Sequence, residues 1–378
     1  MDLTWNRAEE DFRQEARQWL ARHVPRFPLP SGDTREGFAA HLEWERTLFE
    51  ARWSVVSWPE EYGGRDASLW QWLVFEDEYH RSGAPARVTQ NGIFLLAPTV
   101  FAFGTEEQRR RVLPRMAAAE DLWAQGWSEP GAGSDLAATR SRAVRDEEAG
   151  GWRLTGQKTW TTRGAFCTHL FGLFRTDPDT ERHRGLTYFL VPLDAPGVTV
   201  RGFERLDGDE GFAEVFLDDV MVPDADVLGE VGEGWRVAMA TTGSERGLTL
   251  RSPGRFLHAA DRLLDLARTR PGGPGAHRDR VVQSWIEAQA YDLFTLEQVT
   301  SIVEGRQIGA ESSLNKLFWS QLDIALNETA VDLLGPEAET DGPWSRSFLF
   351  SLAGPIYAGT NEIQRNIVAE RLLGLPRR

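Results

Sequence analysis

Cysteine is nearly absent from this sequence of 378 residues, in which Cys167 is the single example. This excludes an internal disulfide framework and a thiolate metal cluster, and we expect Cys167 to be a small core residue rather than a nucleophile. Long apolar segments are also lacking, because the longest, from Ile93 to Phe103, is interrupted and too short to span a bilayer. The N-terminal residues show no basic region followed by an apolar run, so we expect a cytoplasmic protein that makes no membrane contact.

An excess of basic residues is lacking as well. The 42 Lys and Arg residues face 57 Asp and Glu residues, and the formal net charge is −15. A nucleic-acid partner is therefore not expected, because phosphate binding needs a positive surface. The chain is 41% hydrophobic and 26% charged and has 15 Trp residues, which is the composition of a globular protein with a large core. Its length predicts two or three domains.

Helical spacing dominates residues 1–121, which we expect to form an N-terminal helical domain. Apolar residues recur there at intervals of three and four, at Ala8, Phe12, Ala16, Trp19 and Leu20. Further along, Thr105 and Gln108 have the spacing of a capping box, which predicts that a helix begins after Thr105.

Short alternating runs with frequent turn residues dominate residues 122–229. The runs typical of strands are Trp152–Gly156, His169–Phe174, Leu186–Val191 and Ala213–Leu217. We expect this middle domain to be a compact antiparallel β-barrel or sandwich. The fingerprint Gly-x-Gly-x-x-Gly follows none of these runs, and Gly131–Leu136 lacks its third glycine, which argues against a doubly wound parallel sheet.

Helical patterning returns over residues 230–378. The expected helices are Trp235–Ser252, Arg278–Glu304, Glu311–Leu334 and Asn361–Leu373. Helices of this length predict a four-helix bundle, so the chain as a whole belongs to the α+β class.

Four segments, in this order along the chain, resemble signatures of the acyl-CoA dehydrogenases. They are Gly104–Gln108, Ser128–Leu136 (SEPGAGSDL), Gly156–Thr162 (GQKTWTT) and Ile356–Arg365 (IYAGTNEIQR). Each motif alone is a weak signal, but together with the order helices, β domain, helical bundle the resemblance covers essentially the whole chain. It implies an FAD-dependent enzyme that forms an α,β double bond in an acyl-CoA thioester.

The resemblance also implies a set of flavin contacts. Trp127 and Ser128 would lie beside the flavin edge, Trp160 against the isoalloxazine and Thr162 near flavin N5. The full set of cofactor-binding residues expected in this way is Gln125, Trp127, Ser128, Gly133, Ser134, Trp160, Thr161, Thr162, Thr360 and Glu362. Free backbone N–H groups of the glycine-rich turn can approach a pyrophosphate closely. Taken singly, each segment could be an ordinary turn or a core aromatic, and we expect Lys158 to be a turn residue.

The general base of the family is missing from one of its two usual places. Many relatives carry a glutamate immediately before the Gly-Thr of the C-terminal motif, where this sequence has Ala358. A second family solution places the glutamate before an arginine on the first helix after the β domain, and here Glu245 precedes Arg246. Glu245 shares a predicted helix face with Trp235, Ala238, Thr242 and Thr249. We therefore interpret Glu245 as the base; the alternative is a solvated Glu–Arg pair.

Substrate contacts follow from the same resemblance. The thioester oxygen would be held by a flavin ribityl hydroxyl and by the backbone N–H of Ala358, which survives the loss of a side chain. Ser134, Thr242 and Arg246 are the expected substrate-binding residues. A base on this helix accompanies bulky or branched acyl groups within the family.

Two departures from the family pattern concern oligomers. Homo-oligomeric relatives lend an arginine to a neighbour's flavin pyrophosphate from an Arg-x-x-Phe-Gly stretch, but Thr269–Gly275 has no Phe-Gly pair. Likewise, Leu334–Pro336 stands where a Gly-Gly pair is usual. We therefore expect a hetero-oligomer with a homologous subunit, as in the two-subunit actinobacterial steroid side-chain enzymes. The alternative is a homo-oligomer in which Arg270 or Arg278 supplies the cation.

Three other functions stay open from the sequence. An acyl-carrier-protein dehydrogenase and a flavin monooxygenase can share this scaffold, and a non-catalytic subunit of a hetero-oligomer would keep the fold with a vestigial flavin site. For the leading hypothesis, an electron-transfer flavoprotein is the electron acceptor that the resemblance implies.

Overall fold

The computed structural model describes residues 4–246, 252–306 and 309–377, and the side chains of residues 244–246 lie outside the described part. Contacts between residues divide the chain into two compact units. Unit 1 consists of Met1–Arg26, Ala67–Ala84 and Arg246–Arg378, and unit 2 consists of Phe27–Asp66 and Pro85–Glu245.

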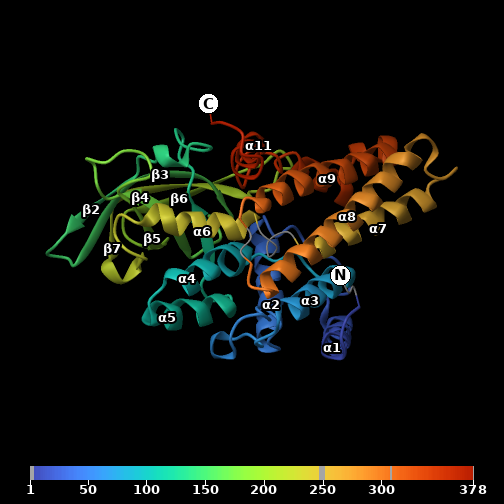
Figure 1. Ribbon diagram of the computed structural model, residues 1–378, viewed down its shortest axis with the longest axis horizontal. Coiled ribbons are helices and arrows are strands. Elements are labelled where there is room, and N and C mark those ends of the chain that lie inside the picture. The colour runs from blue at the N-terminus through green and yellow to red at the C-terminus, as the bar shows by residue number, and fades with distance from the viewer. Residues whose placement is uncertain (1–3, 247–251, 307–308, 378) are drawn as a thin grey trace. The chain divides into compact units, whose positions relative to one another are not determined.

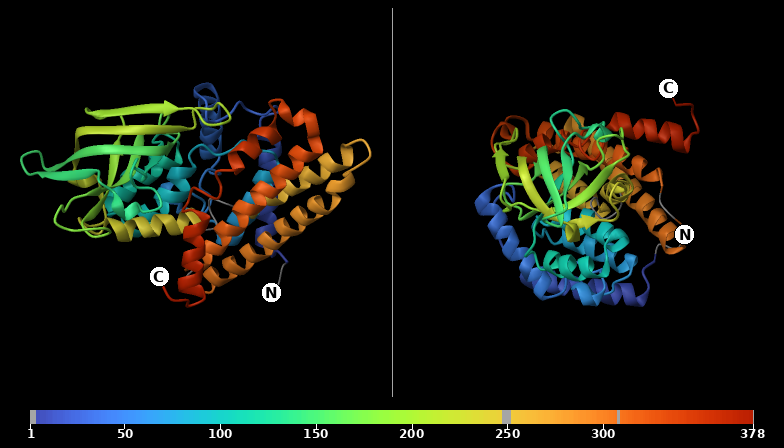
Figure 2. Two further views of the ribbon diagram at one scale, coloured as in Figure 1. Left: turned by 90° about the horizontal axis from the view of Figure 1, so that it is seen from above. Right: turned by 90° about the vertical axis from the view of Figure 1, so that its left-hand side faces the viewer.

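Unit 1 is helical. Its helices are α1 (Arg7–His23), α3 (Leu69–Arg81), α7 (Pro253–Thr269), α8 (Arg278–Val303), α9 (Glu311–Leu334), α10 (Pro343–Ser351) and α11 (Asn361–Ile367), which a π-helical turn (Val368–Leu372) extends. Helices α7, α8 and α9 run alongside one another, as the orange helices in Figure 2 show. Their shared core contains Phe256, Tyr291 and Trp319, each at most 1% exposed.

Ion pairs connect the helices of unit 1. Arg17 of α1 forms a two-point contact with the buried Glu78 of α3, at 2.7 and 2.9 Å. Arg255 of α7 bonds to Asp323 of α9 at 2.8 Å. Close packing of α7 on α3 depends on Gly254, because a Cβ there would lie 3.0 Å from the Cα of Asp77.

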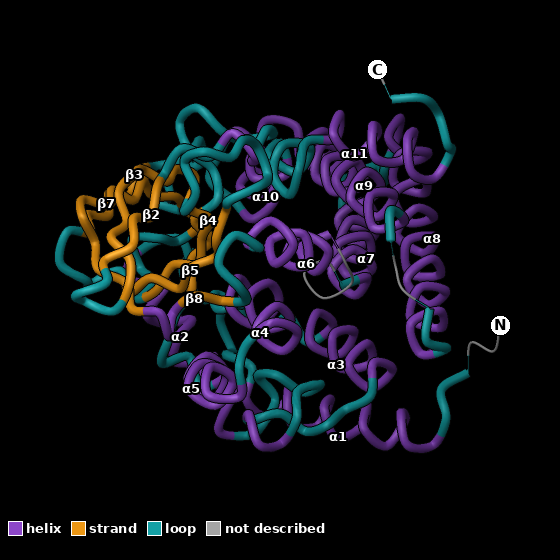
Figure 3. Tube along the Cα trace, turned by 60° about the vertical axis from the view of Figure 1, so that its left-hand side comes forward, coloured by secondary structure: helices purple, strands orange, loops and turns teal. Residues whose placement is uncertain are grey.

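Unit 2 contains a single sheet, whose strands are orange in Figure 3. Its strands are β1 (Trp123–Gly126), β2 (Arg142–Asp146), β3 (Gly151–Thr162), β4 (His169–Arg175), β5 (Leu186–Pro192), β6 (Val198–Phe203), β7 (Phe212–Pro223) and β8 (Val227–Leu228). The strand order is β6-β7-β3-β2-β4-β5-β8, with β1 paired to β4. The pairs β1–β4 and β2–β4 are parallel and the others are antiparallel, so the sheet is mixed.

Four α-helices belong to unit 2 (Figure 1): α2 (Arg35–Glu50), α4 (Ala97–Phe103), α5 (Glu106–Ala117) and α6 (Gly234–Arg246). A buried hydroxyl bond of 2.8 Å joins Thr99 of α4 to Thr241 of α6. The side-chain amide of Gln108 on α5 donates to the carbonyl oxygens of Ala225 and Val227, at 3.0 and 2.7 Å. Short helices on unit 2 are thus fixed to one another and to the edge of the sheet by buried polar bonds.

The α+β class and the order of helices, sheet and helices are confirmed, and so is the capping box at Thr105 and Gln108. Three details of the prediction were wrong. The sheet is mixed rather than antiparallel, and its path ends at β6 and β8 rather than closing into a barrel. Helix α7 was not among the expected helices; Pro253 occupies the favoured first position of this helix. No helix in the described ranges is long and apolar enough to cross a membrane.

Candidate active site

A β-bulge in β3 exposes Trp160. Lys158 lies opposite Val215 and Thr161 opposite Ala213, so β3 has one residue more than β7 across this interval. Trp160 adopts a left-handed backbone conformation (φ 57°), and its side chain is 61% exposed. Bulges of this kind redirect a side chain, and left-handed conformations of non-glycine residues persist only where the surroundings hold them. The result is an indole presented at the surface of the sheet.

Aromatic neighbours fix the orientation of this indole. Phe203 of β6 and Phe212 of β7 meet it edge-on, with ring centroids 5.3 and 5.6 Å away and interplanar angles of 81° and 85°. Because these rings contact the indole at steep angles, they support it without stacking on it.

The second and third signature segments, Ser128–Leu136 and Gly156–Thr162, lie together at the bulge. The carbonyl oxygen of Ser128 accepts a 2.9 Å bond from the N–H of Thr159. One residue further, the Glu129 carboxylate accepts bonds from Lys158 Nζ (2.8 Å) and from the N–H groups of Arg140 (2.7 Å) and Ser141 (3.0 Å). Burial would raise the pKa of Glu129, but these donors outweigh it and hold the pKa below its ordinary value.

Lys158 was expected in a turn, and this prediction was wrong. It lies within β3, is 0% exposed, and donates to the Leu173 carbonyl oxygen as well as to Glu129, each at 2.8 Å. The expected strand ended at Gly156, whereas pairing with β7 continues through Gln157 and Lys158. Cys167 behaves as expected of a non-nucleophilic residue, since burial raises the pKa of its thiol to about 12.

The glycine-rich turn after Glu129 is open. A Cβ at Gly131 or Gly133 would meet nothing within 4 Å, and Gly133 and Ser134 are exposed. Next to them, Asp135 forms a two-point ion pair with Arg182, at 2.8 and 2.9 Å. This leaves room for a ligand to approach the backbone closely.

Unpartnered polar atoms allow a test of whether the residues of unit 2 fit a flavin. Trp127 Nε1 and Thr161 Oγ1 are buried and have no hydrogen-bond partner among the described residues. Half-buried Gln125 lies two residues before Trp127, and half-buried Thr162 is the last residue of β3, directly after Thr161. A planar heteroaromatic ring system with polar edges matches an exposed indole, unsatisfied side-chain groups and an open glycine turn, so the donor set fits FAD.

Unit 1 contains the C-terminal motif. Ala358 has a left-handed backbone (φ 57°), and its carbonyl oxygen accepts a 3.1 Å bond from the buried side chain of Gln364. Thr360 caps α11 by accepting from Ile363 N–H at 3.3 Å, while Glu362 is exposed and lies 3.5 Å from Arg365. These bonds hold the turn before α11 in one conformation.

Beneath this turn, Lys316 is fully buried and donates to Asn361 Oδ1 at 2.6 Å. Tyr357 stacks on Trp319, with ring centroids 5.8 Å apart. The backbone of residues 357–361 is therefore anchored to α9, which contributes both Lys316 and Trp319.

Helix α6 contains the expected base. Ala238 and Thr242 are buried, and the Thr242 hydroxyl donates to the Met239 carbonyl oxygen at 2.8 Å. The side chains of Glu245 and Arg246 lie outside the described residues, although both residues fall within α6. Their roles therefore stay predictions.

Known proteins resemble this chain along its whole length. The profiles of the N-terminal, middle and C-terminal domains of acyl-CoA dehydrogenases match residues 6–120, 124–220 and 232–373. The chain is 41% identical to acyl-CoA dehydrogenase IpdE1 of Mycolicibacterium smegmatis, over 97% of this chain and 98% of the relative.

Among solved structures, the ChsE4-ChsE5 complex from Mycobacterium tuberculosis has a TM-score of 0.85 and 29% identity and covers 100% of both chains. The Tcur3481-Tcur3483 steroid ACAD has a TM-score of 0.86 and 26% identity, again over 100% of both chains. The motifs, the fold and these matches agree: the chain belongs to the acyl-CoA dehydrogenase family of oxidoreductases.

Proposed function

We propose that this protein uses FAD to form the α,β double bond of an acyl-CoA thioester whose acyl group is bulky or branched. The observation that carries the proposal is Trp160, an indole 61% exposed on a left-handed β-bulge. Such a residue offers a large apolar face at a strained position, and strain of this kind clusters at functional sites. A stacked flavin ring would give that face a partner.

The cofactor contacts of this proposal follow from the bonds around the bulge. Trp127, Ser128, Thr161 and Thr162 would contact the flavin ring, and Gly133 and Ser134 the diphosphate. Gln125, Thr360 and Glu362 complete the proposed set of cofactor-binding residues. When bound, FAD supplies the acceptor for the hydride that leaves the substrate Cβ.

Glu245 is the proposed general base that removes the α-proton of the thioester. Ala358 has no group that can take a proton, so the family's other position cannot serve. On α6, Ala238 and Thr242 precede Glu245 by seven and three residues, which places them on the same face of the helix. Their small side chains leave space on this helix face for an acyl chain.

The developing negative charge on the thioester oxygen needs a fixed donor. The Ala358 N–H is the proposed donor, and Gln364 holds the turn that contains it. Ser134, Thr242 and Arg246 are proposed to contact the substrate. A bulky acyl group is supported by the small side chains on α6 and by the steroid ACAD among the similar structures.

The proposal is tested by anaerobic titration of the flavin-loaded protein with acyl-CoA thioesters. The panel comprises straight-chain, branched, alicyclic and steroid-derived acyl groups. Bleaching of the flavin by the branched or cyclic members supports the proposal. Bleaching only by acyl-carrier-protein thioesters would favour an acyl-carrier-protein dehydrogenase instead. Substrate-dependent oxygen consumption with an added reductant would favour a flavin monooxygenase.

A hetero-oligomer is a second proposal, and it has its own observation. Arg270 lies in the segment that matches the Arg-x-x-Phe-Gly stretch, from which homo-oligomeric relatives lend an arginine to a neighbour's flavin. Both terminal nitrogens of Arg270 contact Glu337, at 2.9 and 3.0 Å. One of them also donates to the Leu334 carbonyl oxygen at 3.2 Å. Because this arginine is already engaged, a homologous subunit is proposed to neutralise the diphosphate.

Two similar structures, the ChsE4-ChsE5 complex and the Tcur3481-Tcur3483 steroid ACAD, are each named for two proteins, which supports this second proposal. The test is to purify the chain alone and with a co-expressed relative and to measure flavin content. Stoichiometric, tightly held FAD in the isolated chain would refute it. Reoxidation of the reduced protein by an electron-transfer flavoprotein tests the proposed electron acceptor.

A further inference from the structure

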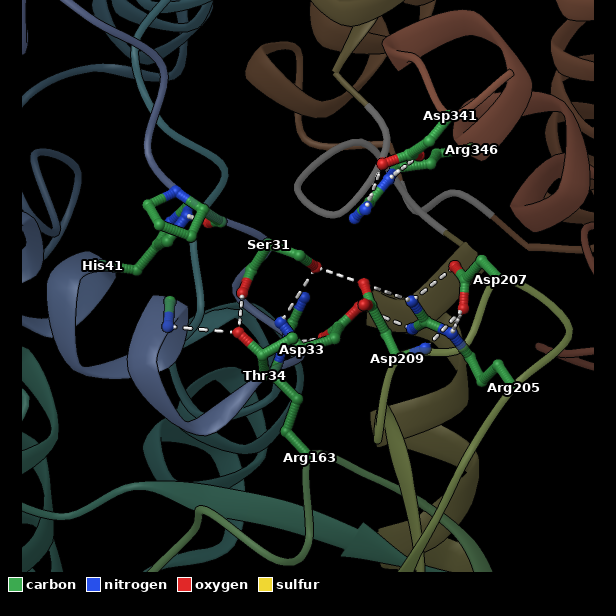
Figure 4. A network of polar contacts seen from close by, with 12 residues as sticks. Ser31, Asp33, Thr34, His41, Arg163, Arg205, Asp207, Asp209, Asp341 and Arg346 are labelled. Atoms are coloured by element: carbon green, nitrogen blue, oxygen red, sulfur yellow. Dashed lines mark hydrogen bonds and ion pairs between the residues drawn. The ribbon is translucent and has the colours of Figure 1, made fainter. Parts of the chain in front are cut away.

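A network of buried charges joins three segments of unit 2 that are far apart in sequence (Figure 4). Asp33 Oδ1 accepts from Arg163 Nε at 2.6 Å, and Asp33 Oδ2 accepts from Arg205 Nη1 at 2.5 Å. The side chains of all three residues are only 12–13% exposed. One carboxylate therefore bridges two guanidinium groups in a largely dry site.

Two further carboxylates complete the network around Arg205. Asp207 accepts from Arg205 Nη2 at 2.8 Å and from Nε at 3.2 Å. Asp209 lies 3.6 Å from Arg205 and accepts from the Ser31 hydroxyl at 2.5 Å. Arg205 thus has two carboxylate partners besides Asp33.

Arg163 belongs to the strained turn that follows Trp160. It has a left-handed backbone (φ 54°), and its N–H donates to the Gly211 carbonyl oxygen at 2.9 Å. Its own carbonyl oxygen accepts from Phe166 and Cys167, at 2.9 and 3.1 Å. Trp160 and Arg163 together enclose Thr161 and Thr162, so two strained residues bracket the proposed flavin contacts.

Left-handed conformations of non-glycine residues are strained, and the surroundings must supply the free energy that holds them. Asp33 contributes from outside the strand, since it holds the Arg163 side chain from the segment before α2. Burial would raise the pKa of Asp33, but the two guanidinium groups outweigh it and hold the pKa below its ordinary value. Asp33 is therefore ionised at neutral pH and accepts from Arg163 Nε as a charged group.

We propose that Asp33 is a positioning residue that sets the geometry of Trp160–Thr162 through Arg163. The inference rests on the proposed function, because it requires that these residues face the flavin. It goes beyond that function by assigning a role to a residue that lies outside every motif and more than a hundred positions from the strand that it holds.

The test compares Asp33→Asn with Asp207→Asn in the flavin-loaded protein. Both substitutions remove one carboxylate of the same network, but Asp207 contacts Arg205 and not Arg163 among the bonds described. Asp33→Asn is expected to shift the visible absorption band and reduction potential of the bound flavin and to weaken FAD binding about tenfold, equal to about 1.4 kcal/mol. Asp207→Asn is expected to stay within about twofold of the parent.

Two further measurements separate positioning from general loss of stability. Asp33→Glu, which keeps the charge, should restore most of the spectrum. Hydrogen exchange of residues 163–167 should speed up in Asp33→Asn and not in Asp207→Asn. If Asp33→Asn does not fold, Arg163→Gln carries the same expectations, because it breaks the same bond from the other partner.

Equal effects of Asp33→Asn and Asp207→Asn would overturn the inference, because both carboxylates would then act only on stability. Trp160→Phe distinguishes this outcome from failure of the proposed function. A flavin spectrum unchanged in Trp160→Phe would refute the flavin contact and the inference with it. A spectrum shifted in Trp160→Phe but not in Asp33→Asn would refute the inference alone.

Discussion

Replacing Lys158 with Met tests the buried ion pair that joins the signature segments Ser128–Leu136 and Gly156–Thr162. The Nζ of Lys158 lies 2.8 Å from Glu129 Oε1, and their side chains are 0% and 7% exposed. At an effective dielectric constant of about 20, two unit charges at that distance attract by about 6 kcal/mol, before the cost of desolvation is subtracted. Lys158→Met leaves the Glu129 carboxylate buried with only its two backbone donors. We expect it to lower the free energy of unfolding by about 3–5 kcal/mol.

The assay is urea unfolding followed by circular dichroism, with two controls. Glu129→Gln combined with Lys158→Met should recover much of the loss, because no buried charge then remains unpaired. Arg153→Met removes another cation of β3, whose ion pair with Asp146 at 2.9 Å is solvent-exposed, and it should cost far less. A urea midpoint of Lys158→Met equal to that of Arg153→Met would refute the reasoning.

Two further predictions concern unit 1. Ala358→Gly should stabilise the protein by about 0.5–1 kcal/mol in thermal melting, because Ala358 is left-handed (φ 57°) and glycine adopts that conformation freely; a lower melting temperature would contradict this. Burial, together with the Asp77 carboxylate, raises the pKa of Asp292 from 3.8 to about 6. The folded protein therefore binds this proton more tightly than the unfolded chain does, and it loses stability as the pH rises from about 4 to about 6. Asp292→Asn should therefore raise the free energy of unfolding by about 1–2 kcal/mol at neutral pH and leave it unchanged below about pH 4, as measured by urea midpoints across pH. A stabilisation at low pH would contradict this prediction.

Local signals in the sequence sufficed for much of the fold. The capping box at Thr105 depends on residues three positions apart, and strands such as Leu186–Val191 have the alternation or apolar density of buried strands. The helix Pro253–Thr269 was missed because a proline can either end a helix that precedes it or begin a helix that follows it, and Pro253 does the second. Short β1, β2 and β8 have too few residues for a periodic signal.

The candidate site was predictable only where motifs mark it. Trp160 could be named from its segment, but its bulge could not, because a bulge is a property of the register between β3 and β7. The bond between Asp33 and Arg163 was not predicted at all, since an ion pair between residues 130 positions apart leaves no local pattern. Lys158 left no such signal either, because its partner Glu129 lies 29 positions earlier in the chain.

The central claim is that Glu245 takes the proton that a residue at position 358 takes in many relatives. The most direct measurement is anaerobic, single-turnover reduction of the bound flavin by the best acyl-CoA, in the parent, in Glu245→Gln and in Glu245→Gln combined with Ala358→Glu. We predict that Glu245→Gln retains its flavin but slows reduction by about 10²–10⁴-fold, and that the second substitution restores part of the rate. Reduction of Glu245→Gln at a rate within about threefold of the parent would contradict the claim.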